Sequence, residues 1–148
     1  MSDNRLKIGI TQGDINGIGW EVILKSLSDS RMPELFTPVV SGSMQAAKAY
    51  MPLLEKQVDG FTLQFNVVAS ADDARRGKVN FVECGDATPK AGIASAEGGK
   101  AAVEALERAV AALENGAIDA LVTAPIDKES AQSDTFHFTG HTEFFASH

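Results

Sequence analysis

The sequence predicts an α/β fold with a mostly parallel sheet, and three observations support this prediction. First, apolar runs of strand length alternate along the chain with segments whose apolar residues recur every three or four positions. Second, a glycine-rich turn separates the first expected strand from the first expected helix, where open parallel sheets bind ligands. Third, the run 118–124 is apolar on both faces, as in the middle of a parallel sheet.

The first half of the chain predicts two strands and two helices. Residues 6–11 form an expected strand, and the helix after the turn has one apolar face made of Trp20, Ile23, Leu24 and Leu27. A weaker strand is expected over 36–42, where Pro38 favours a sheet edge or a strand start. The next helix has an apolar face made of Met44, Ala47, Met51 and Leu54, and Pro52 is expected to kink or break it.

The second half predicts three more strands and a long helix. Strands are expected over 61–70 and 79–84, with a short helical turn between them. The helix over 95–115 has Ser95 as a plausible cap, Gly116 just past its end, and an apolar stripe made of Val103, Leu106, Val110 and Leu113. The strand over 118–124 follows. The last residues, HTEFFASH, look like the first turns of another helix, which suggests that the chain is a piece of something longer.

Composition limits the classes of function. The chain has 148 residues, 44% of them apolar and 22% charged, which suits one soluble globular domain. A net charge of −7 gives no basic surface for nucleic acid or an anionic membrane. Cys84 is the only cysteine, so no internal disulfide can form and a reducing compartment is expected. No apolar run approaches the roughly 20 residues of a membrane span, and the first residues lack a secretory signal. We expect a soluble, cytoplasmic protein.

The glycine-rich turn contains Gly13, Asp14, Gly17 and Gly19. Its spacing, G-x-x-x-G-x-G, differs from the dinucleotide fingerprint G-x-G-x-x-G, and no Gly-Lys-Ser/Thr of a nucleotide P-loop follows. Asp14 also argues against an anion resting directly in the turn. The alternative interpretation is a tight strand-to-helix turn with Asp14 or Asn16 as a cap, and the spacing alone leaves both possibilities open.

Two further clusters contain candidate site residues. Thr123 ends the strand over 118–124, and Lys128 follows five residues later; composition alone also allows a plain turn and a solvated lysine. In the second cluster, His141, Thr142 and Glu143 begin an expected helix, where Glu143 suits the positive end of the helix dipole. The same dipole lowers the pKa of a histidine, so a neutral imidazole could exchange hydrogen bonds with a ligand. A capping-region histidine without a task remains the alternative.

The three histidines do not predict a metal site. His137, His141 and His148 are spaced four and seven residues apart, which on one continuous helix would place them on one face. Gly140 makes such a continuous helix doubtful. We therefore expect no metal site in this chain.

Together, the three clusters resemble the 4-hydroxythreonine-4-phosphate dehydrogenase family of vitamin B6 biosynthesis. TQGDINGIGWEV is similar to the family's T-M-G-D-P-A-G-I-G-P-E-[IV], and DALVTAPIDK to D-A-[LIV]-V-T-A-P-[IV]-[NH]-K. FTGHTEFFA matches F-x-G-H-T-E-[FLY]-[LF]-A, and the matches come in the family's order. The first motif keeps its glycines, Asp14 and Glu21, and departs from the pattern at Gln12, Ile15, Asn16 and Trp20.

The resemblance implies a fold like that of isocitrate and isopropylmalate dehydrogenases. Such enzymes have two three-layer α/β/α domains, an active site in the cleft between them, and a homodimeric assembly. We interpret the chain as the N-terminal part of such an enzyme and as incomplete relative to the family. Roughly, residues 1–120 would form the first domain and residues 121–148 the start of the second.

The resemblance also implies an activity. It is the NAD(P)-dependent oxidation, then decarboxylation, of a phosphorylated hydroxy amino acid, assisted by a divalent metal (Zn, Mg or Co). The family's substrate-contacting His-Thr pair falls on His141 and Thr142, and its motif lysine falls on Lys128, in or beside the site. Asp14, Thr123 and Glu143 are further expected residues of the cleft. The family's metal-binding histidines lie past residue 148, and no residue here is assigned to the nicotinamide cofactor.

Two alternatives remain open beside this interpretation. One is a related dehydrogenase for another 4-phosphorylated hydroxy acid, and the other is a non-catalytic α/β module that binds a phosphorylated ligand. The isolated 148-residue chain is expected to lack dehydrogenase activity and to associate through an exposed interdomain or dimer surface.

Overall fold

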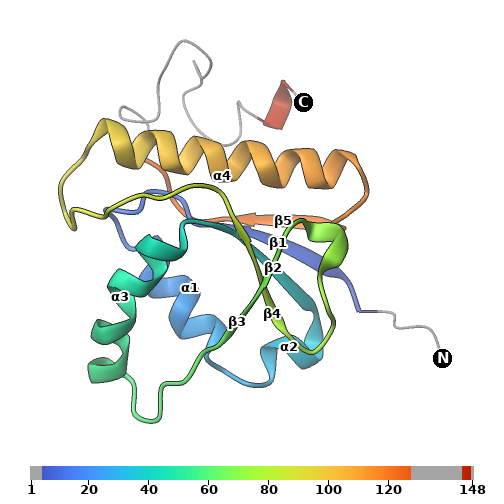
Figure 1. The fold of residues 1–148 in the computed structure, drawn as a ribbon, viewed down its shortest axis with the longest axis horizontal. Coiled ribbons are helices and arrows are strands. Elements are labelled where there is room, and N and C mark those ends of the chain that lie inside the picture. The colour runs from blue at the N-terminus through green and yellow to red at the C-terminus, as the bar shows by residue number, and fades with distance from the viewer. Residues whose placement is uncertain (1–4, 128–144, 148) are drawn as a thin grey trace.

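A five-stranded sheet runs through the part of the chain that the computed structural model describes, residues 5–127 and 145–147 (Figure 1). Every neighbouring pair of strands is parallel, which confirms the α/β prediction. The strand order is β3-β4-β2-β1-β5. The strands are β1 (Lys7–Thr11), β2 (Thr37–Gly42), β3 (Phe65–Val68), β4 (Val79–Glu83) and β5 (Ala120–Thr123).

Helices cover both faces of the sheet and make three layers. Helices α1 (Gly19–Leu27) and α3 (Met44–Gln57) lie on one face, and α4 (Ala96–Glu114) crosses the other (Figure 1). Two short elements complete the described fold, α2 (Met32–Leu35) and the 3₁₀ turn η1 (Ala71–Asp73). None of the described helices is long and apolar enough to cross a membrane.

The larger core lies between the sheet and the α1–α3 layer. Trp20, Leu24 and Leu54 from the helices are fully buried there with Phe81 from β4. The rings of Trp20 and Phe81 stack with their centroids 6.1 Å apart. Burying a side chain of this size stabilises a fold by about 1.5–3 kcal/mol, so these contacts fix α1 and α3 to the sheet.

Small residues let α4 approach the opposite face closely. Ala102, Ala105 and Ala109 are all buried, whereas the larger Leu106 and Val110 join a separate cluster beside β5. Ser95 caps the helix by accepting a hydrogen bond from the Gly98 amide at 3.0 Å, as expected from the sequence. The expected stripe is wrong at its last position, because Leu113 is 38% exposed.

Three other elements differ from their predictions. Within the described residues β5 pairs with β1 alone, so it forms an edge strand rather than a central one, and Val122 is 55% exposed. The 36–42 strand, by contrast, agrees with one of its two predicted placements, because Pro38 lies near its start while the strand occupies the centre of the sheet. Helix α3 continues through Pro52, and β3 covers only part of the expected 61–70 strand.

Candidate functional site

The first two sequence motifs meet at the carboxyl ends of β1 and β5. Thr11 is the register partner of Thr123, and the Ala124 amide donates to the Thr11 carbonyl at 3.2 Å. One turn further on, the Asp14 amide donates to the Pro125 carbonyl at 2.8 Å. Helix α1 leaves β1 on one face while α4 enters β5 from the other, so this is a switch point of the sheet, where open α/β folds bind ligands.

Two of the three glycines in the first turn make this close meeting possible. Gly13 has a φ of 66°, and a Cβ there would lie 2.4 Å from the Pro125 carbonyl oxygen. A Cβ on Gly19 would lie 2.5 Å from the Gln12 carbonyl oxygen. Gly17 has no neighbour nearer than 3.5 Å. The turn therefore uses Gly13 and Gly19 to pack backbone against backbone.

Asp14 shapes the same turn. Its Oδ1 accepts a hydrogen bond from the Asn16 amide at 3.0 Å, the local pattern that lets aspartate stabilise a turn. The expected tight strand-to-helix turn is confirmed, but the expected cap is wrong. The N-cap position of α1 is Ile18, and no side chain caps it. The carboxylate of Asp14 in the turn argues against an anion bound directly there.

Tyr50 of α3 is hydrogen-bonded to the backbone of the same turn. Its hydroxyl donates to the Ile15 carbonyl. Burial raises the pKa of Tyr50, and the nearby negative charge of Asp14 raises it further. The phenol therefore stays neutral well above physiological pH and serves as a hydrogen-bond donor to the backbone.

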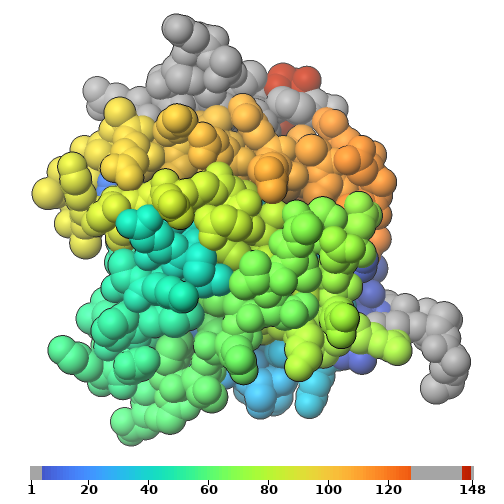
Figure 2. Space-filling view, viewed as in Figure 1, coloured from blue at the N-terminus to red at the C-terminus, as the bar shows by residue number. Residues whose placement is uncertain are grey.

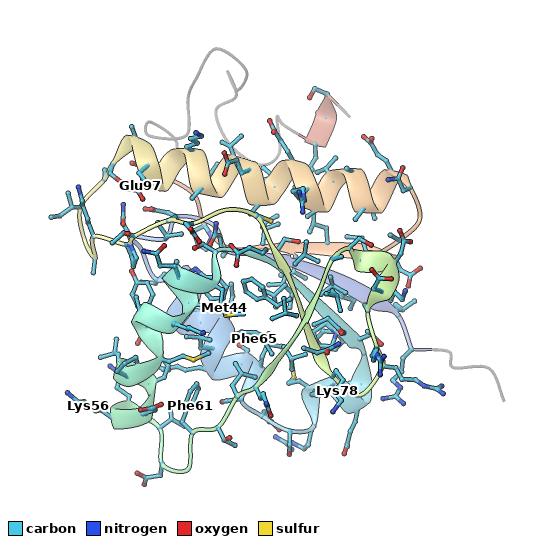
Figure 3. The ribbon with its side chains drawn as sticks, viewed as in Figure 1. Met44, Lys56, Phe61, Phe65, Lys78 and Glu97 are labelled. Carbon is cyan, nitrogen blue, oxygen red and sulfur yellow. The ribbon has the colours of Figure 1, made fainter. Side chains whose placement is uncertain are left out.

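A long loop, residues 84–95, follows β4 and lies beside the glycine turn. It leaves β4, crosses the surface between α3 and α4, and turns into α4 (Figure 2). Side chains from both helical layers bind its backbone: Ser43 Oγ accepts from the Ala87 amide at 3.1 Å, and Glu97 Oε1 accepts from the Thr88 amide at 2.9 Å. Figure 3 labels Glu97 at the start of α4. The loop is thus held in one position beside the switch point.

Two pockets of the described residues lie near α4. A hollow of about 280 Å³ between the 84–95 loop and α4 is lined by Asp86, Glu97, Glu104 and Lys100, so carboxylates outnumber cations. A second pocket, of about 190 Å³, lies on the α4 side of the sheet between η1 and α4. Within residues 5–127 and 145–147, no group of three or more His, Cys, Asp or Glu side chains could hold a metal ion.

Of the predicted site residues, the structure brings Asp14 and Thr123 to the same edge. The others, Lys128, His141, Thr142 and Glu143, lie outside the described residues. Sequence reasoning gave Gln12 no role and considered Asn16 only as a possible cap, yet both side chains organise this edge. Their only signal was their departure from the family's first motif.

Comparisons with known proteins decide the family. A family model described as pyridoxal phosphate biosynthetic protein PdxA matches residues 34–148. The chain belongs to this family. It is 44% identical over 146 residues to the 4-hydroxythreonine-4-phosphate dehydrogenase of Bacteroides thetaiotaomicron, covering 97% of this chain and 39% of that protein. It is 36% identical over 151 residues to the D-threonate 4-phosphate dehydrogenase of Cupriavidus necator, covering 99% and 44%.

Solved structures of PdxA relatives share the fold. The crystal structure of a 4-hydroxythreonine-4-phosphate dehydrogenase from Burkholderia phymatum superposes with a TM-score of 0.80 at 31% identity, covering 98% of this chain and 44% of that one. The corresponding enzyme from Klebsiella pneumoniae gives 0.78 at 25% identity, covering 99% and 44%. The chain therefore spans about two-fifths of the length of these relatives.

Proposed function

We propose that the chain is the N-terminal part of a dehydrogenase that oxidises a phosphorylated hydroxy amino acid, 4-hydroxythreonine 4-phosphate. One observation carries this proposal: the hydrogen bond between the Asp14 amide and the Pro125 carbonyl. It joins two family motifs more than a hundred residues apart at the switch point of a parallel sheet. The remaining motif, with His141 and Thr142, follows in the sequence and matches the family's substrate-contacting pair.

The proposed residue roles follow from chemistry. A neutral imidazole at position 141 and a hydroxyl at position 142 can both hydrogen-bond an anionic substrate. Lys128 would add a positive charge in or beside the site, and Glu143 would favour the start of the following helix. Asp14 and Thr123 would line the floor of the proposed cleft, because both lie at the carboxyl ends of β1 and β5.

The cofactors come to the proposal from the family resemblance. NAD or NADP would accept the hydride from the carbinol carbon, and a divalent metal would polarise the carbinol oxygen before carbon dioxide is lost. Among residues 5–127 and 145–147, no group of three or more His, Cys, Asp or Glu side chains could hold the metal ion.

The proposal extends to organisation and location. Residues up to about 120 would form the first domain and 121–148 the start of the second, with β5 at the boundary. Exposed apolar side chains at the N-cap of α1 (Ile18, 62%), on α1 (Val22, 52%) and on β5 (Val122, 55%) support an association surface, such as that of a homodimer. The lone Cys84 is compatible with the cytoplasm.

The isolated chain should scatter light as an associated species and reduce no NAD.

A chimaera tests the activity. The aligned segment of the Bacteroides thetaiotaomicron relative is replaced by residues 1–148 of this chain, and NAD reduction is followed with a divalent metal and 4-hydroxythreonine 4-phosphate. We expect turnover within about tenfold of the intact relative, because the two segments are 44% identical. A folded chimaera without turnover on any phosphorylated hydroxy acid would favour the non-catalytic binding module.

A second substrate is tested in the same assay. Because a D-threonate 4-phosphate dehydrogenase is 36% identical, D-threonate 4-phosphate is the competing candidate. The ratio of kcat/KM for the two substrates decides between them. We expect the hydroxy amino acid to be preferred, and a reversed ratio would assign the chain to the other branch.

A further inference from the structure

Asn16 is a buried side chain whose polar atoms all have partners. It is 3% exposed. Its Nδ2 donates to Ser95 Oγ at 2.9 Å, and its Oδ1 accepts from the Lys90 amide. Its main-chain amide donates to Asp14 at 3.0 Å, and its carbonyl accepts from the Gly92 amide at 2.8 Å. A single residue thus joins the glycine turn, the cap of α4 and the 84–95 loop.

The apex of that loop, residues 89–94, depends on Asn16. Among the described residues, the hydrogen bonds that tie the apex to the rest of the chain both end on Asn16. The residues of the apex from Lys90 to Ala94 are exposed, and Ile93 has 60% of its surface in solvent. An exposed segment with so few contacts opens locally at little cost unless specific hydrogen bonds hold it.

The position of the apex matters because of what lies beside it. Asn16 is two residues from Asp14, which is hydrogen-bonded to the β5 turn at Pro125. The loop itself begins where β4 ends, at the same carboxyl edge of the sheet. A Cβ on Gly98 would lie 2.6 Å from Asn16 Nδ2, so the first turn of α4 is also packed against this residue.

We propose that Asn16 is a positioning residue of the substrate site. It fixes the loop apex as one wall of the entrance through which the phosphorylated hydroxy acid reaches the β1–β5 switch point. The inference rests on the proposed function for the identity of that ligand. Without Asn16, the apex has to be ordered when substrate binds, which weakens binding without changing the reacting groups.

The first measurement uses the 148-residue chain itself. Amide hydrogen exchange is compared between the wild type, Asn16→Ala and the matched control Asn66→Ala, which removes an asparagine hydrogen-bonded to Asn80 at 2.9 Å. In Asn16→Ala the Lys90 amide should exchange at least tenfold faster, and trypsin should cleave faster after Lys90. The amides of Cys84 and Ala87, which have other partners, should keep their protection. Unchanged exchange at Lys90 overturns the inference.

The second measurement separates positioning from general stability. In the active chimaera, Asn16→Ala should raise the KM for the phosphorylated substrate about fivefold and leave kcat within twofold. Asn66→Ala, which lies outside the Asn16 network, should keep KM within twofold even if its melting temperature falls. An Asn16→Ala chimaera with wild-type KM overturns the inference alone. A wild-type chimaera without turnover overturns the proposed function, and with it the assignment of the ligand.

Discussion

Gln12 and Trp20 are joined by a buried hydrogen bond in which Trp20 Nε1 donates to Gln12 Oε1 at 3.2 Å. The same oxygen accepts from the Ser43 amide at 2.9 Å, and Gln12 Nε2 donates to the Ala101 carbonyl at 3.1 Å. Gly42 leaves room for the pair, since a Cβ there would lie 2.8 Å from both side chains. The side-chain amide of Gln12 therefore connects the end of β1 to α1, α3 and α4. Both Gln12 and Trp20 are positions at which this chain departs from the family's first motif.

Replacing Gln12 by Met should destabilise the fold strongly. Gln12→Met leaves the Trp20 indole and the Ser43 amide without acceptors in a buried site, and each unpaired donor costs about 1–3 kcal/mol. We expect the free energy of unfolding, measured in urea, to fall by about 2–4 kcal/mol. The matched control is Gln45→Met on the exposed surface of α3, expected within about 0.5 kcal/mol of wild type. Equal effects in both variants would contradict the role of the network.

A double-mutant cycle isolates the Gln12–Trp20 bond. Trp20→Phe removes the indole donor together with some core volume, and Gln12→Met removes its acceptor. If the two side chains act as a pair, the double variant should lose less stability than the sum of the single variants, by about 0.5–3 kcal/mol. Strict additivity would show that the bond contributes nothing specific.

Two glycines of one turn should respond to alanine with opposite signs. Gly13→Ala places a Cβ against the Pro125 carbonyl at a positive φ, so the turn loses its contact with β5. We expect a loss of about 2–4 kcal/mol in the free energy of unfolding. Gly17→Ala meets only ordinary contacts and should stabilise by up to about 1 kcal/mol through the unfolded state. Thermal unfolding of both variants measures the difference, and a stable Gly13→Ala protein would refute the packing role.

The sequence was sufficient for what local periodicity determines. The alternation of strands and helices, the buried face of α1 and the Ser95 cap were all confirmed, because each depends on a few neighbouring residues. The sequence was also sufficient to predict that the glycine turn and Thr123 lie at the same edge of the sheet, because the carboxyl ends of parallel strands share an edge. These features carry the candidate site.

The rest depends on contacts between distant segments. Apolar residues on both faces predict a central strand, yet β5 lies at the edge of the described sheet, where α4 covers one face and Val122 is exposed on the other. Gln12 and Asn16 look like ordinary polar residues until the fold brings Ala101 and Lys90 to them, 89 and 74 residues away. No local pattern encodes such partners.

Cys84 should resist thiol reagents and make the fold sensitive to alkali. Burial raises the pKa of its thiol from 9.0 to about 11, with Arg108 lowering it in part. An unfolded chain ionises this thiol first, so the free energy of unfolding should fall as pH rises from about 9 to 11, by roughly 2–3 kcal/mol at most. Cys84→Ala should remove that part of the pH dependence. Rapid labelling of the native protein at pH 8 would contradict the burial.

The test closest to catalysis is a substitution of His141 in the chimaera. If its imidazole contacts the substrate in the transition state, His141→Ala should lower kcat/KM at least tenfold, about 1.4 kcal/mol of binding, with a marked rise in KM. His137→Ala is the matched control, because it removes a histidine four residues away that matches no position of the family motif. Its kinetics should stay within twofold of the parent chimaera. If kcat/KM falls by the same factor in both variants, the cause is a shared effect on folding of the segment. Wild-type kinetics in His141→Ala would exclude this residue from the site.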